Sequence, residues 1–188
     1  MILKKNKKKY FSGFSLLESM LAVFVVTGGM LVVITLISKS LVDSLDSRDQ
    51  VIASLLAEEG IELVRNVRDN NWMSGVGSFD RNLDYTGYCR ISRAFIYANG
   101  DTLTCGLGAS VSNDYRMYLN ESNGAYNHNS TGTVPTRYYR RIQINGSATT
   151  RTITSMVVWG SSFPALLTDC STGNKCAYSQ VSLNTWGE

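Results

Sequence analysis

The chain has 188 residues, with 18 Lys and Arg against 15 Asp and Glu, and a formal net charge of +3. Hydrophobic residues make up 44% and aromatic residues 10%, which excludes a disordered chain because a core can be built from them. Most of the lysines lie within the first nine residues, so the positive excess does not describe a general surface for nucleic acids. The length suits a single domain.

An apolar segment follows these lysines. Residues 14–38 carry one charged side chain, Glu18, and the run from Ser19 to Ser38 carries none. As a helix this run is about 30 Å long, enough to cross the hydrocarbon core of a membrane. No small-residue cleavage site follows it, so we expect the segment to be retained rather than removed as a secretory signal. The basic residues before it predict a single-pass protein with its N-terminus in the cytoplasm.

Glu18 is unusual because it lies inside this apolar run. An acidic group costs roughly 2.5–3.5 kcal/mol at the centre of a membrane helix and less near its end. One interpretation is a charge tolerated near the interface. The other starts from the run Gly13-Phe14-Ser15-Leu16-Leu17-Glu18, between a lysine-rich leader and a long apolar stretch, which resembles the type IV prepilin motif.

The resemblance implies that a prepilin peptidase removes residues 1–13 by cutting between Gly13 and Phe14, and methylates the new amine of Phe14. It implies that Glu18 pairs with that amine on a neighbouring subunit during assembly. The run from Ser15 to Val23 is most similar to minor pilins of the PilV type. The expected transmembrane and filament-core residues include Phe14, Leu16, Leu17, Leu21, Val25, Leu31, Ile34 and Ile37.

Residues 39–72 are amphipathic and contain no proline, which predicts one helix over about 14–70 that packs on the following domain. Asn70-Asn71-Trp72 and Ser74–Gly77 are expected to form its exit. The expected apolar face comprises Leu41, Leu45, Ile52, Leu55, Leu56, Leu63, Val64 and Val67. The expected polar remainder comprises Asp43, Asp46, Arg48, Asp49, Glu58, Glu59, Glu62, Arg65 and Arg68.

Residues 73–188 are β-like, with turns rich in Gly, Asn and Ser. Asn99-Gly100 and Asn145-Gly146 are typical hairpin turns. The expected strands are 88–98, 101–105, 115–120, 137–145, 149–159 and 177–186. The predicted class is therefore α+β: a long N-terminal helix, transmembrane in its first half, packed on an antiparallel sheet, as in pilins.

Four cysteines lie in this head. An even number in an exported domain predicts disulfides. Three connectivities are possible, and we favour Cys89–Cys105 across the first hairpin and Cys170–Cys176 around a small loop. A zinc site is the competing interpretation, but the spacing lacks C-x-x-C pairs.

The remaining candidates for chemistry are weak. His128 is the single histidine and lies in a polar stretch, so no metal site, cofactor or enzymatic activity is predicted. Arg137-Tyr138-Tyr139-Arg140-Arg141 mixes basic and aromatic residues, as DNA-binding strands do, although a strand with one face in the core is favoured. Asn120, Asn129 and Asn145 begin N-glycosylation patterns.

The resemblance thus leads us to expect a structural subunit of a type IV pilus or related filament. Its expected partners are other pilin subunits, the inner membrane before assembly, the prepilin peptidase and the pilus assembly machinery. Its final location would be the cell surface. Three alternatives remain open: a type II secretion pseudopilin, a competence pseudopilin that contacts DNA, and a membrane-anchored adhesin that keeps residues 1–13.

Overall fold

The computed structural model describes residues 15–73, 81, 83–91, 103–147, 149–160, 162–171 and 173–184. The expected leader and cleavage site (1–13 and Phe14), the helix exit at Ser74–Gly77 and the turn at Asn99-Gly100 lie outside these residues. So do parts of three expected strands, 92–98, 101–102 and 185–186. The chain divides into two compact units, Met1–Ser44 and Leu45–Glu188.

One helix, α1, runs through Leu16–Met73, which confirms the long helix expected from the uninterrupted pattern and the absence of proline. It continues through Asn70-Asn71-Trp72, where we had placed its exit. Its part in the first unit is exposed throughout, and α1 is long and apolar enough to cross a membrane.

The second unit contains an antiparallel sheet of seven strands, so the α+β class is confirmed. Its elements are β1 (Gly87–Ile91), β2 (Leu103–Cys105), β3 (Arg116–Asn120), β4 (Ala125–Asn127), β5 (Val134–Gly146), β6 (Thr150–Val158) and β7 (Cys176–Asn184), with short 3-10 turns at Asn113–Tyr115 and Leu167–Asp169. The long strand β5 organises the sheet. One of its edges pairs with β6, and its other edge pairs with β3 and β1.

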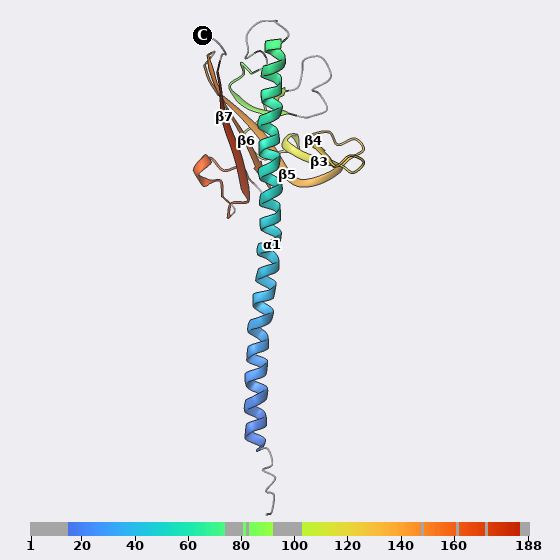
Figure 1. Ribbon diagram of the computed structural model, residues 1–188, viewed down its shortest axis with the longest axis vertical. Helices are drawn as coiled ribbons and strands as arrows, with labels where there is room; N and C mark the ends of the chain where they lie inside the picture. Colours follow the sequence, from blue (N-terminus) through green and yellow to red (C-terminus); the bar gives the residue numbers. More distant parts are fainter. Residues whose placement is uncertain are drawn as a thin grey trace, which may run out of the picture. The chain divides into compact units, whose positions relative to one another are not determined.

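The part of α1 from Asp49 onward lies across one face of this sheet (Figure 1). Two apolar clusters fill the contact. The first joins Ile61, Leu63, Val64 and Val67 to sheet residues that include Ile142, Ile144, Ile153 and Leu183. The second joins Ala53, Leu56 and Ala57 to Met117, Tyr138, Val157 and Trp159. A smaller cluster on the opposite face contains Met156, Val158 and Cys176, with Tyr139 and Phe163 against them.

Two expectations for the faces of α1 are corrected. Leu41, Leu45 and Leu55 are exposed, whereas the small residues Ala53, Ala57 and Gly60 are buried. Asp49, expected on the polar face, is buried.

The β5–β6 hairpin forms, but its turn begins later than expected. Asn145 and Gly146 belong to β5, and Gly146 pairs with Arg151. Gly146 has φ +123°, and a Cβ there would overlap the carbonyl oxygen of Thr150, so glycine is required within the strand end rather than in the turn.

Candidate functional site

The apolar part of α1 presents bulky side chains on all sides. Leu16, Phe24 and Leu31 are 79%, 76% and 66% exposed, and every residue from Leu16 to Ser44 is exposed. So much exposed apolar surface requires a nonaqueous surrounding, which a membrane or neighbouring helices would supply. The expected filament-core residues Leu16, Leu17, Leu21, Val25, Leu31, Ile34 and Ile37 all lie here; Phe14 is outside the described residues.

Hydroxyl groups in this segment are satisfied within the helix. The Thr27 Oγ1 donates to the carbonyl oxygen of Val23 at 2.9 Å, Thr35 Oγ1 to Val32 at 2.8 Å and Ser38 Oγ to Ile34 at 2.9 Å. Such bonds to the preceding turn let Ser and Thr reside in an apolar medium without an unpaired hydroxyl. The segment is therefore compatible with lipid along its length except at Glu18.

Glu18 lies in the first turn of α1, and its backbone N–H donates to the carbonyl oxygen of Ser15 at 3.0 Å. The N-terminal end of a helix carries a partial positive charge that favours a carboxylate. The Glu18 side chain is exposed, and no described residue forms a hydrogen bond with it. An unpaired carboxylate is costly in an apolar environment, and a cationic partner would offset that cost.

A polar contact joins the second half of α1 to the head at Asp49, which is 1% exposed. One carboxylate oxygen accepts a hydrogen bond from the Tyr138 hydroxyl at 2.8 Å, and the other accepts from the Arg137 guanidinium at 2.7 Å. Burial and the hydrogen bond to Asp49 raise the pKa of Tyr138, so it stays a donor. The cost of burying Asp49 is offset by these two donors.

A second polar contact is made by Arg140, whose side chain is fully buried. Its guanidinium donates to the carbonyl oxygens of Leu56 at 3.1 Å and Ile91 at 2.9 Å, and forms an ion pair with Glu59 at 3.2 Å. Arg140 therefore ties α1 to the sheet and to β1. Gly60 makes room for this contact, since a Cβ there would lie 3.2 Å from Arg140 Cδ and would overlap Ser155 Oγ.

Arg141 occupies the opposite face of β5 and is 5% exposed. Its guanidinium stacks between the rings of Tyr88 and Phe163, 4.4 and 4.2 Å from their centroids, and donates to the carbonyl oxygen of Ala109 at 2.5 Å. Such stacking on two aromatic faces stabilises a desolvated guanidinium. Arg140 and Arg141 are therefore both buried within the head and are not presented on its surface.

His128 is not the solvated loop residue expected from its polar neighbours. Its Nδ1 lies 3.0 Å from the carbonyl oxygen of Arg116, which can only accept, so Nδ1 carries the proton. Its Nε2 is buried without a hydrogen-bond partner. Burial, followed by the nearby charge of Arg140, lowers the pKa of His128 to about 3, and the imidazole is neutral at physiological pH.

The structure forms the two disulfides favoured from the sequence, Cys89–Cys105 and Cys170–Cys176. Cys89 and Cys105 are directly opposite across β1 and β2, with their Cα atoms 4.1 Å apart. Within residues 15–73 and the described part of the head, no cluster of three or more His, Cys, Asp and Glu could hold a metal ion.

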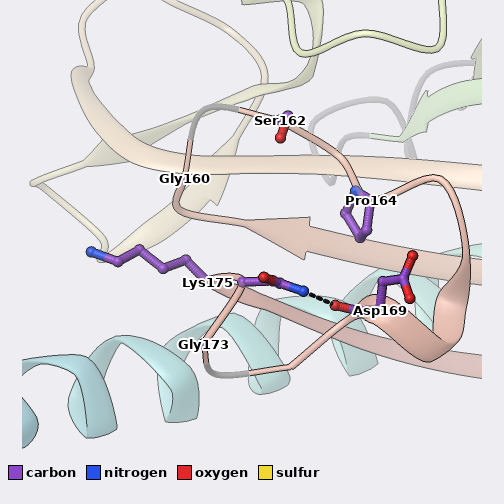
Figure 2. A pocket seen from close by; sticks show the side chains of 7 residues that line it. Gly160, Ser162, Pro164, Asp169, Gly173 and Lys175 are labelled. Atoms are coloured by element: carbon purple, nitrogen blue, oxygen red, sulfur yellow. Dashed lines mark hydrogen bonds between the residues drawn. The ribbon is translucent and has the colours of Figure 1, made fainter.

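The second disulfide closes a loop beside a pocket of about 490 Å³ (Figure 2). The pocket is lined by Gly160, Ser162, Pro164, Asp169, Gly173, Asn174 and Lys175. The Asn174 side-chain amide donates to the backbone carbonyl oxygen of Asp169, and the Cys176 N–H donates to Ser171 at 3.2 Å, so the loop is internally bonded. In Figure 2 the Lys175 side chain extends away from Asp169. The pocket is wide, polar and solvent-facing, and no two of its side chains form a catalytic pair.

No family model matches the chain, and neither the search of curated proteins nor that of solved structures found a match.

Proposed function

We propose that the chain is a structural subunit of a type IV pilus or related filament, with the minor pilins of the PilV type as its nearest resemblance. It would enter the inner membrane through α1, be cut after Gly13 and polymerise through the apolar half of the helix. The head would then face outward from the filament at the cell surface. Prepilin peptidase and the pilus assembly machinery would be its partners in maturation.

The observation that carries this proposal is the Glu18 carboxylate in the first turn of α1, directly before an exposed apolar run, Ser19 to Ser38, that carries no charge. A simple membrane anchor has no use for a carboxylate at this depth, because burying it there costs free energy. A helix that must recognise the cationic N-terminal amine of a neighbouring subunit does have a use for it. Cleavage at Gly13–Phe14 would create that amine four residues before Glu18.

The pair between Glu18 and the amine would determine the register in which subunits assemble more than it would stabilise the filament. Two desolvated charges gain little net free energy over apolar residues, but removing one partner leaves the other buried and uncompensated. A subunit could then enter an apolar filament only where the carboxylate and the amine meet. The hydroxyl groups bonded within α1 add no competing polar contact along the remaining apolar surface.

The test compares Glu18→Ala with Glu58→Ala, a matched removal of an exposed acidic residue of the same helix. Each full-length variant is expressed in cells that lack the native chain, and its amount is measured in the membrane and in sheared filaments. We expect Glu18→Ala to reach the membrane normally but to fall at least roughly tenfold in filaments, since a lost partner of a buried pair costs about 3–5 kcal/mol. Glu58→Ala should match wild type. Wild-type incorporation of Glu18→Ala would overturn the proposal.

A further inference from the structure

Strand β7 ends the sheet with an open edge. Its nine residues, Cys176–Asn184, pair with β6 in one continuous register from Val158↔Cys176 to Thr150↔Asn184, with no bulge. No described strand pairs with its other side. In Figure 1, β7 forms the outer margin of the head. A long regular edge of this kind offers unpaired backbone groups to another strand.

The backbone groups that face outward can be assigned from one hydrogen bond. The Trp159 N–H donates to the carbonyl oxygen of Lys175 at 3.0 Å, so this pair is hydrogen-bonded and the next pair along, Val158↔Cys176, is not. Alternation then directs the N–H and C=O groups of Tyr178, Gln180, Ser182 and Asn184 away from β6. The Cys176 N–H also points outward, and it is taken by Ser171 within the disulfide loop.

The edge lacks the features that usually prevent strand pairing. Natural edge strands carry charges, prolines, bulges or covering segments. The sequence of β7, Cys-Ala-Tyr-Ser-Gln-Val-Ser-Leu-Asn, has no charge and no proline. The exposed side chains of β7, those of Tyr178, Gln180, Ser182 and Asn184, end in hydroxyl or amide groups, and Tyr178 is 45% exposed. Nothing along this strand would repel an identical strand laid against it.

We propose that β7 is a self-association surface, on which β7 of a second copy of this chain adds as an antiparallel strand. Two-fold pairing centred on Val181 brings together all four outward-bonding residues, with Tyr178 opposite Asn184 of the second copy and Gln180 opposite its Ser182. Each of these pairs exchanges two N–H···O bonds. The proposal goes beyond the pilin assignment and does not depend on it.

The chosen register also joins apolar surface. Val181 is half-buried against the first apolar cluster between helix and sheet. In the paired sheet it lies opposite its own copy at a non-hydrogen-bonded position, where Cα atoms approach to about 4.5 Å. One strand pair buries less surface than the roughly 1,200–2,000 Å² of a stable complex, so the dimer should be weak and reversible.

The test traps this dimer by disulfide formation in the full-length protein in detergent micelles. Val181→Cys places one thiol opposite its copy at a separation that a disulfide can bridge. Ser130→Cys is the matched control, because it is exposed and uncharged but lies far from β7 in the chain. Mass analysis confirms that both native disulfides remain. Under mild oxidation we expect covalent dimer from Val181→Cys at several times the level from Ser130→Cys.

Adding Ser182→Pro to Val181→Cys removes an outward N–H but no bond to β6, and should return the dimer to the control level. If that variant does not fold, Gln180→Lys with Ser182→Lys serves instead, because it puts like charges opposite each other in both pairs. Equal cross-linking of Val181→Cys and Ser130→Cys would overturn the proposal. So would dimer that persists with either blocking change, or cross-linking only to a different chain.

Discussion

The Asp49 carboxylate of the long helix and the Tyr138 hydroxyl of β5 are joined by a hydrogen bond of 2.8 Å in an environment where Asp49 is 1% exposed. Together with the ion pair between Glu59 and Arg140, this hydrogen bond connects α1 to the sheet through polar groups at two positions along the helix, Asp49 and Glu59. Apolar packing alone would tolerate sliding, whereas these bonds are satisfied in a single register.

Tyr138→Phe should therefore destabilise the protein. It removes one of the donors to Asp49 and leaves a buried carboxylate oxygen undersatisfied, at a cost of about 1–3 kcal/mol. Denaturant unfolding of the full-length protein in micelles, followed by tryptophan fluorescence, measures this because Trp159 packs in the same cluster. A double-mutant cycle with Asp49→Asn should show a coupling free energy of at least about 0.5 kcal/mol. Additive effects would mean that the hydrogen bond contributes nothing specific.

Gly60→Ala should destabilise the head by about 1–3 kcal/mol, although alanine is the better helix former. A Cβ at this position would overlap Ser155 Oγ and approach Ser155 Cβ to 3.1 Å, in a site that also holds Arg140. Gly29→Ala is the matched control, because nothing lies within 4 Å of its Cβ position. Ser155→Gly should restore part of the loss in Gly60→Ala. Equal unfolding midpoints for Gly60→Ala and wild type would refute the close approach.

These two contacts mark the limit of what periodicity can predict. The long helix α1, most of the strands and the apolar segment follow from local patterns in the sequence and were expected, whereas β4 and the order of the strands in the sheet were not. Asp49 and Gly60 were not identified as residues that contact the sheet. A charge every few residues is typical of a solvated helix face, and a lone glycine in such a pattern does not by itself indicate a close contact. Their partners, Tyr138, Arg140 and Ser155, lie far along the chain, so only the tertiary fold brings them together.

The same reasoning explains the arginines of β5. Tyr138, Ile142 and Ile144 share the buried face of β5, as a strand with one face in the core requires. Alternation along the strand also places Arg140 on that face, although a charged residue type alone would argue against a buried position. The carbonyl oxygens of Leu56 and Ile91 that accept its hydrogen bonds come from separate segments and leave no trace near Arg140 in the sequence.

The half-buried His128 predicts a dependence of stability on pH. Its pKa of about 3 in the folded state lies below the ordinary value near 6.5. The unfolded chain therefore binds the proton first as pH falls, so the free energy of unfolding decreases below about pH 6.5, by at most about 1.4 kcal/mol per pH unit. The positive charges of Arg140 and Arg90 add to this effect because both disfavour imidazolium.

Comparing unfolding free energies at pH 7.5 and pH 5 measures the contribution of His128 before most carboxylates titrate. His128→Asn is the informative variant, since its amide can donate to the carbonyl oxygen of Arg116 without titrating. The free energy of unfolding of this variant should be nearly constant between pH 7.5 and pH 5, while that of the wild type decreases. The same slope in both proteins would show that other groups are responsible.

The assignment as a filament subunit is tested most directly by the N-terminus of the mature protein. Intact mass and N-terminal sequencing of the chain purified from membranes and from sheared filaments give the first residue and its modification. The account predicts a chain that begins at Phe14 with a methylated amine, four residues before Glu18. A mature chain that begins at Met1 and keeps its lysine-rich leader would contradict it, and would favour a membrane-anchored surface protein.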